Sequence, residues 1–188
     1  MHSISRKEPR ARRPLSPQAV AVKNIRRAIA HAYRRILVLG PKGSRRLASV
    51  RTALAPLDVQ LAVIDLKGVG SIDELDRAAK RAGLGCDFQG AMAQLEKRAR
   101  RHRVAFAFHN FGECSSLRVD DRVVYAVWLG AKYHCQSSIM VFTTSNEEFL
   151  ARCFERFREC RTFVYRVELI DADQGSVKGG SCSEEGSQ

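Results

Sequence analysis

Five short apolar runs recur along the chain and are separated by longer stretches of mixed polarity. The runs lie at residues 36–39, 61–66, 104–108, 138–143 and 163–169. A short continuous apolar run is typical of a strand buried on both faces, and strands that alternate with helices favour a parallel sheet. The pattern therefore predicts one α/β domain with a five-stranded, mainly parallel sheet.

The stretches between these runs carry the spacing and the end signals of helices. The clearest helix opens at a capping box formed by Ser71 and Glu74 and stops at Gly83. Further helices are predicted over residues 48–54, 88–99 and 121–135, and after an N-cap at Asn146. Their apolar faces should lie on the sheet.

The predicted helix at 88–99 runs into a basic segment, residues 97–103, which holds four arginines, a lysine and a histidine. Cations stabilise the negative end of a helix dipole. We therefore favour a solvated helix end for this segment, and a binding role stays open.

Polar segments border the domain on both sides. Residues 1–20 are predicted to form a basic, disordered tail, and residues 172–188 a flexible Gly/Ser-rich tail, which leaves 21–171 for the folded part. The basic segment fits a nuclear localisation signal or a DNA-contacting arm. An organellar presequence fits less well because of Glu8 and two prolines.

Charge narrows the choice of partner. The chain holds 32 Lys and Arg against 20 Asp and Glu, a net charge of +12, and residues 15–170 alone carry +11. A folded domain this basic favours nucleic acid or another polyanion, although charge gives affinity without sequence preference.

The cysteine pattern and the hydropathy indicate the cellular compartment and whether a metal site is expected. The six cysteines form no C-x-x-C pair, and the histidines near them lack zinc-finger spacing, so we expect reduced thiols and no metal site. There is no signal-peptide core and no apolar stretch near 18 residues. We expect no membrane partner and, together with the basic tail, a nuclear location.

The segment after the first strand is built like a phosphate-binding loop with altered chemistry. A working loop, G-x-x-x-x-G-K-[ST], uses glycines for backbone N–H contacts, a lysine for the β/γ-phosphates and a hydroxyl for magnesium. Here the last glycine is Arg45, the lysine is Arg46 and the hydroxyl is Leu47. The degenerate loop is made of Gly40, Lys42, Gly43, Ser44, Arg45 and Arg46.

The end of a later strand is a second place in the sequence that bears on ATP hydrolysis. In P-loop ATPases a later strand ends in two acids that hold magnesium and polarise the attacking water. Here the strand at 104–108 runs into His109 and Asn110, so both acids are missing, and Glu113 lies several residues past the strand end. His109 without a partner is more often structural than a ligand or a base.

The order of these motifs resembles the ATPase-like domain of subunit 4 of the eukaryotic origin recognition complex, an AAA+ protein. The resemblance runs from about Val22 to Asp171 and takes in the loop, the segment 104–112 with Phe111 retained, and the segment 123–128. It also covers a sensor-like strand that ends at Thr144 and the arginine-bearing segment 149–161. It implies a degenerate AAA+, P-loop NTPase-like three-layer sandwich, in which the family's helical lid and winged-helix domains are absent.

The resemblance also implies a place for arginine. Family members present an arginine from the segment matching 149–161 to ATP on a neighbouring subunit. Arg161, with a one-residue shift, or Arg156 takes that place here, and pairing with phosphate or nearby acids is the alternative.

Three functions follow as hypotheses. The first is a non-catalytic subunit of an origin recognition complex that partners other subunits, especially the largest, ATP-binding one, together with DNA. It would hold no cofactor of its own, with ATP bound weakly in cis or at the interface. The second is a divergent nucleotide hydrolase that uses Lys42 and Glu113 in place of the missing groups. The third is a stand-alone basic nucleic-acid-binding protein.

Overall fold

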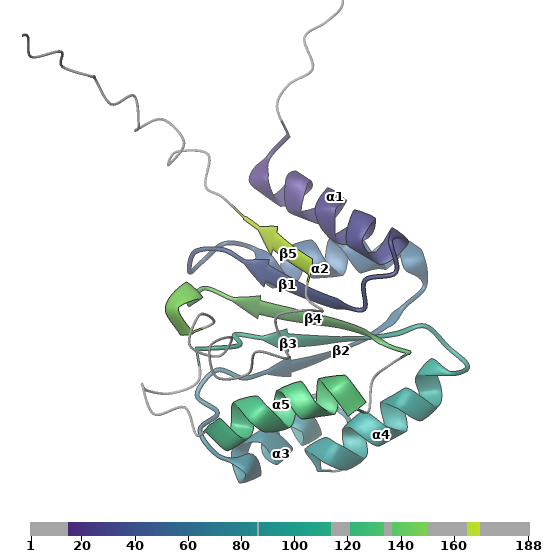
Figure 1. Cartoon of the computed structure of the whole chain (residues 1–188), viewed down its shortest axis with the longest axis vertical. Coiled ribbons are helices and arrows are strands. Elements are labelled where there is room, and N and C mark those ends of the chain that lie inside the picture. The colour runs from purple at the N-terminus through teal and green to yellow at the C-terminus, as the bar shows by residue number, and fades with distance from the viewer. Residues whose placement is uncertain (1–14, 86, 114–120, 134–136, 150–164, 170–188) are drawn as a thin grey trace, which may run out of the picture.

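A five-stranded parallel sheet lies between two layers of helices (Figure 1). The computed structural model describes residues 15–85, 87–113, 121–133, 137–149 and 165–169. The strands are β1 (Arg35–Leu39), β2 (Gln60–Asp65), β3 (Val104–His109), β4 (Ile139–Thr144) and β5 (Tyr165–Glu168). Their order is β2-β3-β4-β1-β5, and every neighbouring pair is parallel. The predicted α/β class and five-stranded sheet are confirmed.

The helices divide between the two faces of the sheet. Figure 1 shows α1 (Pro17–Ala30) and α2 (Arg46–Leu54) on one face, and α3 (Ile72–Arg81), α4 (Phe88–Ala99) and α5 (Asp121–Tyr133) on the other. A short 3₁₀ turn, η1 (Ala55–Leu57), follows α2. The arrangement is a three-layer sandwich, as expected.

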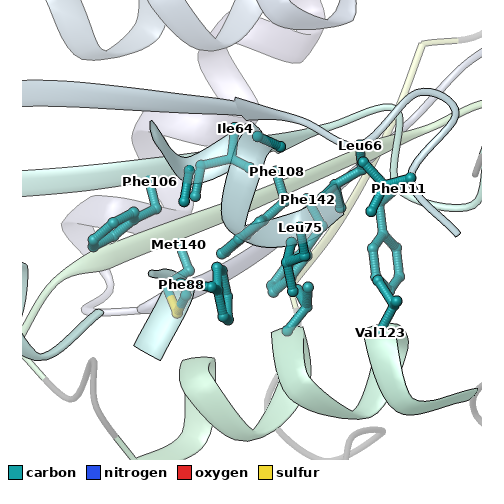
Figure 2. Packing of buried hydrophobic residues seen from close by; sticks show 14 of the residues in the cluster. Ile64, Leu66, Leu75, Phe88, Phe106, Phe108, Phe111, Val123, Met140 and Phe142 are labelled. Carbon is teal, nitrogen blue, oxygen red and sulfur yellow. The ribbon is translucent and has the colours of Figure 1, made fainter. Parts of the chain in front are cut away.

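Strands β1 to β4 alternate their side chains between two separate cores, because successive residues of a strand point to opposite faces. Phe106, Phe108 and Phe142 pack toward α3, α4 and α5, with ring centroids of Phe108 and Phe142 5.2 Å apart (Figure 2). Ala105 and Ala107 of the same strand β3 face the α1 and α2 side. Large rings therefore fill one face, and small residues let the helices approach the other.

Helix α3 forms as its end signals predict. Ser71 is its N-cap and its Oγ accepts a hydrogen bond from the Glu74 N–H at 3.3 Å, while Glu74 Oε2 accepts one from the Gly70 N–H at 2.7 Å. The first bond satisfies an N–H group that the helix start leaves without an internal partner, and the second holds the chain just before the cap. Gly83, with φ of 78°, ends the helix.

Helix α1 corrects the predicted boundary of the basic tail. Residues 17–20, which we assigned to the disordered tail, belong to this helix. Ser16 caps it by accepting from the Ala19 N–H, Pro17 occupies its first turn, and Ala21, Ile25 and Ala28 are buried. Burial of this apolar face against the sheet outweighs the local polarity that suggested disorder. Residues 1–14 and 172–188 lie outside the described residues.

The helices predicted over 48–54, 88–99 and 121–135 are found near their expected ranges, and α5 is described as far as Tyr133. Most of the helix predicted after Asn146 lies outside the described residues. Asn146 Oδ1 accepts from the Phe149 N–H at 2.9 Å, which is the expected N-cap contact. Among the described residues, no helix combines the length and hydropathy needed to cross a membrane.

Candidate functional site

The loop between β1 and α2, residues 40–45, is the one predicted to be a degenerate phosphate-binding loop. Gly43 has φ of 85°, a conformation that favours glycine. A Cβ at Gly40 would lie 2.6 Å from Ser44 Oγ and 3.0 Å from Leu169 Cβ, so a larger residue there would require these neighbours to shift. The predicted strand, loop and helix are thus present in the order that a nucleotide-binding loop requires.

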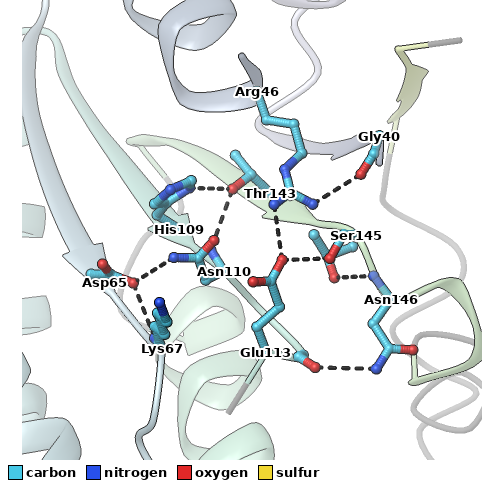
Figure 3. Close-up of polar contacts among 12 residues, drawn as sticks. Gly40, Arg46, Asp65, Lys67, His109, Asn110, Glu113, Thr143, Ser145 and Asn146 are labelled. Carbon is cyan, nitrogen blue, oxygen red and sulfur yellow. Dashed lines mark hydrogen bonds and ion pairs between the residues drawn. The ribbon is translucent and has the colours of Figure 1, made fainter. Parts of the chain in front are cut away.

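Arg46 lies inside this loop instead of projecting into solvent (Figure 3). Its side chain is 5% exposed. Nη1 donates to the carbonyl oxygen of Gly40 at 3.0 Å, and Nη2 donates to Glu113 Oε1 at 2.8 Å. Nε is buried and has no hydrogen-bond partner among the described residues. The guanidinium therefore ties the start of the loop to a carboxylate from the segment after β3.

Glu113 is the acidic partner that holds Arg46 in place. Its Oε1 also accepts a hydrogen bond from Ser145 Oγ at 2.5 Å. Partial burial raises the pKa of Glu113, but hydrogen bonds from Ser145 and Arg46 outweigh burial and leave the pKa below its usual 4.5. A carboxylate with a lowered pKa is a weak base, and this one is already engaged by two donors.

His109 and Asn110, which replace the two expected acids, are both held by neighbours. His109 Nδ1 lies 2.7 Å from Thr143 Oγ1, and Asn110 Nδ2 donates to Asp65 Oδ1 at 2.9 Å (Figure 3). Burial lowers the pKa of His109 below its usual 6.5. Asn110 adopts φ of 57°, a left-handed conformation that asparagine tolerates better than most residues. Both side chains serve to join strand ends in this structure.

Asp65 was not among the predicted site residues. It ends β2 and pairs in register with His109, so its carboxylate lies at the same edge of the sheet. The signal available in the sequence was the acid at the end of a buried run, since parallel strands bring their carboxyl ends to one edge. Glu113 was considered displaced, and the structure brings it into contact with Arg46 across 67 positions of sequence.

Thr144, the sensor-like residue, is fully buried. Its Oγ1 accepts from the Asn146 N–H at 3.0 Å, and its carbonyl oxygen accepts from the Gly40 N–H at 3.2 Å. The preceding residue, Thr143, is the one that contacts His109. The sensor-like strand therefore supports the loop through its backbone, while the neighbouring threonine makes the side-chain contact.

The other predicted loop residues differ in exposure. Lys42 and Arg45 are exposed, and the charge of Lys42 contributes to lowering the pKa of Glu113. Ser44 Oγ is buried and makes no hydrogen bond within the part of the chain that the structure describes. Arg156 and Arg161, the candidate trans arginines, lie outside the described residues. Over the described part of the chain, no three His, Cys, Asp or Glu side chains are grouped so as to hold a metal ion.

No protein-family model matches the chain, and no curated protein does. Solved structures do match. The ORC2 protein of Aeropyrum pernix, in ADPNP and ADP complexes, has a TM-score of 0.61 at 10% identity over 88% of this chain and 50% of that one. Cdc6p of Pyrobaculum aerophilum has a TM-score of 0.55 at 13% identity over 85% and 48%. Drosophila ORC bound to AT-rich DNA and Cdc6 has a TM-score of 0.52 at 11% identity over 82% and 57%.

The chain thus spans about half the length of these initiator structures. At such identities the likeness concerns the fold and does not distinguish one subunit type from another. The chain has the α/β fold of the ORC and Cdc6 proteins of the AAA+ initiator group.

Proposed function

We propose that the chain is a non-catalytic subunit of a replication-initiation assembly, related to subunit 4 of the origin recognition complex. The observation that carries the proposal is the Arg46–Glu113 pair inside an initiator-like fold. The pair places a guanidinium where a working loop has its phosphate-binding lysine, and it engages that group with protein oxygens.

A magnesium-bound nucleotide does not fit this loop in the ordinary way. Leu47 offers no hydroxyl for magnesium, and the strand end offers His109 and Asn110 in place of two acids. Two carboxylates at this edge of the sheet are already engaged. Glu113 accepts a hydrogen bond from Arg46, and Asp65 accepts one from Asn110. We propose that the domain is retained as a scaffold, which docks beside an ATP-binding partner and works at chromosomal DNA in the nucleus.

We propose the partners of this chain from the solved structures that it resembles. Drosophila ORC is seen with DNA and Cdc6, so its AAA+ domains work within a multi-subunit assembly on DNA. For this chain we propose other origin recognition subunits, above all the largest, ATP-binding one. Arg161 or Arg156 would then face the ATP of that neighbour, where an arginine stabilises charge in the transition state.

Reconstitution with the organism's largest origin subunit tests this proposal. We expect a stable complex, and we expect the double variant Arg156→Ala/Arg161→Ala to lower its ATP turnover by about tenfold or more, since a trans arginine contributes a large factor. Arg158→Ala in the same segment is the matched control and should leave turnover unchanged. Failure to form a complex would remove the proposal, and unchanged turnover in the double variant would remove only the arginine's role.

Calorimetry with ATP and magnesium separates the proposal from the hydrolase alternative. We expect no binding by the isolated chain, since Arg46 and Glu113 engage one another. Micromolar binding that disappears in Lys42→Ala would instead favour a divergent hydrolase.

A further inference from the structure

The opposite edge of the sheet, where the strands begin, carries a second feature that the loop does not explain. Two adjoining hollows of about 570 and 550 Å³ open there and share Leu57, Val59 and the segment 101–103. Figure 1 shows the C-terminal ends of α1 and α4 at this edge, away from the arrowheads of the strands. The shared residues make the two hollows one continuous depression, here called the amino-edge hollow.

Its polar lining is almost entirely cationic. The larger hollow is lined by five arginines and one histidine and by no acid, and Asp58 is the one acid in the smaller. The arginines are Arg26, Arg34, Arg100, Arg101 and Arg103, and the histidine is His102. They come from α1, from the turn before β1, and from the turn between α4 and β3. Convergence of three separate elements is more than a solvated helix end requires.

Most of these arginines are available to a ligand. Arg34, Arg100, Arg101 and Arg103 are exposed, and none forms an ion pair with an acid in the described part of the chain. Arg26 is held in place by donating to the carbonyl oxygens of Ala53 and Thr52, at 3.3 and 3.0 Å. The hollow therefore keeps its positive charge, which is costly to gather without a counter-charge.

The backbone under the arginines is fixed. The N–H groups of Arg101 and His102 donate to the Arg98 carbonyl at 2.9 Å each, and the Gln60 N–H donates to the Arg103 carbonyl at 3.0 Å. The last contact ties the arginine turn to the start of β2. The side chains consequently project from a held turn.

The lining of the larger hollow also includes apolar side chains, among them Ile29, Leu57, Val59 and Ile139. Guanidinium groups suit phosphate oxygens, and apolar side chains suit a sugar or the face of a base. Five arginines on one continuous depression suit a polyanion with several phosphates better than one compact phosphate. These features together indicate a phosphodiester chain.

We infer that the amino-edge hollow binds the phosphate backbone of DNA, with Arg100, Arg101 and Arg103 as its principal contacts. The inference extends the proposed function, on which it rests for the choice of DNA, by assigning a surface to the contact. This surface lies at the edge of the sheet opposite the altered loop, so binding there needs no nucleotide in that loop.

The test compares two triple variants of the full chain that remove the same charge. The hollow variant, Arg100→Ala/Arg101→Ala/Arg103→Ala, removes three arginines that line the hollow. The control variant, Lys67→Ala/Lys80→Ala/Arg81→Ala, removes three exposed cations elsewhere. Binding to duplex and single-stranded DNA is measured by fluorescence anisotropy over a range of salt. At 0.1 M salt the hollow variant should lose at least about tenfold in affinity, and its slope of log K against log salt should fall by about 2 to 3. The control variant should stay within about threefold.

A site-specific crosslink gives a second reading. A photoreactive p-benzoylphenylalanine replacing Gln60, which lines the smaller hollow, should crosslink to DNA. The same group replacing Gln89, exposed near the start of α4, should not, because about 15 Å of helix separates it from the hollow.

The outcomes are separable from those of the proposed function. Equal loss in both triple variants, no DNA binding by the wild-type chain, or no crosslink from position 60 would overturn the inference. Assembly with the ATP-binding subunit is followed in the same variants. A hollow variant that loses DNA yet still assembles supports the inference, and a wild-type chain that binds DNA through the hollow but joins no partner leaves the inference standing while the proposed function fails.

Discussion

The two edges of the sheet differ in how their positively charged side chains are paired. At the carboxyl edge, Arg46 is buried and paired with Glu113, and His109, Asn110 and Asp65 are hydrogen-bonded in turn. At the amino edge, arginines line an open hollow with hardly any acid beside them. The first arrangement satisfies its charges internally and contributes to stability, whereas the second leaves them for a partner.

Removal of Glu113 is the change with the largest expected effect. Glu113→Ala should lower the free energy of unfolding by about 3 kcal/mol, because it leaves the Arg46 guanidinium buried without its counter-charge. Urea denaturation followed by circular dichroism measures the loss. The double variant Arg46→Met/Glu113→Leu removes both charges and should recover most of it. A loss below about 0.5 kcal/mol for Glu113→Ala would mean that the pair does not hold the loop.

A smaller, pH-dependent effect should arise at His109. Burial lowers its pKa in the folded chain below 6.5, so the unfolded chain binds the proton more readily. The contribution of His109 is fully present above pH 6.5 and is lost as pH falls through the folded-state pKa. Unfolding of the wild type and His109→Gln across pH 5 to 8 should show a shallower slope in the variant, by at most about 1.4 kcal/mol per pH unit. Parallel curves would contradict this.

Glu113 also causes the free energy of unfolding to fall as pH decreases, but over a more acidic pH range. Since its pKa is lowered below 4.5, its contribution is present above that pH and is lost as pH falls through the folded-state value. The two residues can therefore be distinguished by the pH at which stability declines.

The smallest effect on stability is expected at the amino edge. Arg100→Ala/Arg101→Ala/Arg103→Ala should change the free energy of unfolding by no more than about 0.5 kcal/mol, because these side chains are exposed and unpaired with described acids. The shift of the thermal unfolding midpoint relative to the wild type reports this change in the free energy of unfolding. A large loss would assign these arginines to the fold, and a gain would indicate that they repel one another in the free chain.

Local pattern was enough to predict much of the fold. The five apolar runs became the five strands, and the capping box at Ser71 became the start of α3, because these signals act within a few residues. The edge strands β2 and β5 are only partly buried, since each has one neighbouring strand. Helix α1 was missed although Ser16, Pro17 and the spacing of Ala21, Ile25 and Ala28 were present. The basic residues around them favoured a disordered tail, and the sheet that buries the helix was not visible in that stretch.

The candidate site was predictable only in part. The altered loop and the missing acids are properties of single positions, so the sequence by itself determined that Arg46, His109 and Asn110 stand where other groups were expected. It did not determine what those residues touch.

Only the tertiary structure decided those contacts. Parallel strands in the order β2-β3-β4-β1-β5 bring all carboxyl ends to one edge and all amino ends to the other, so residues far apart in sequence become neighbours. Glu113 meets Arg46 for this reason, and Arg26 and Arg34 meet the segment 100–103 for the same reason at the opposite edge. Residue types and their local spacing fix which elements form, whereas strand order decides which charges are paired and which remain open.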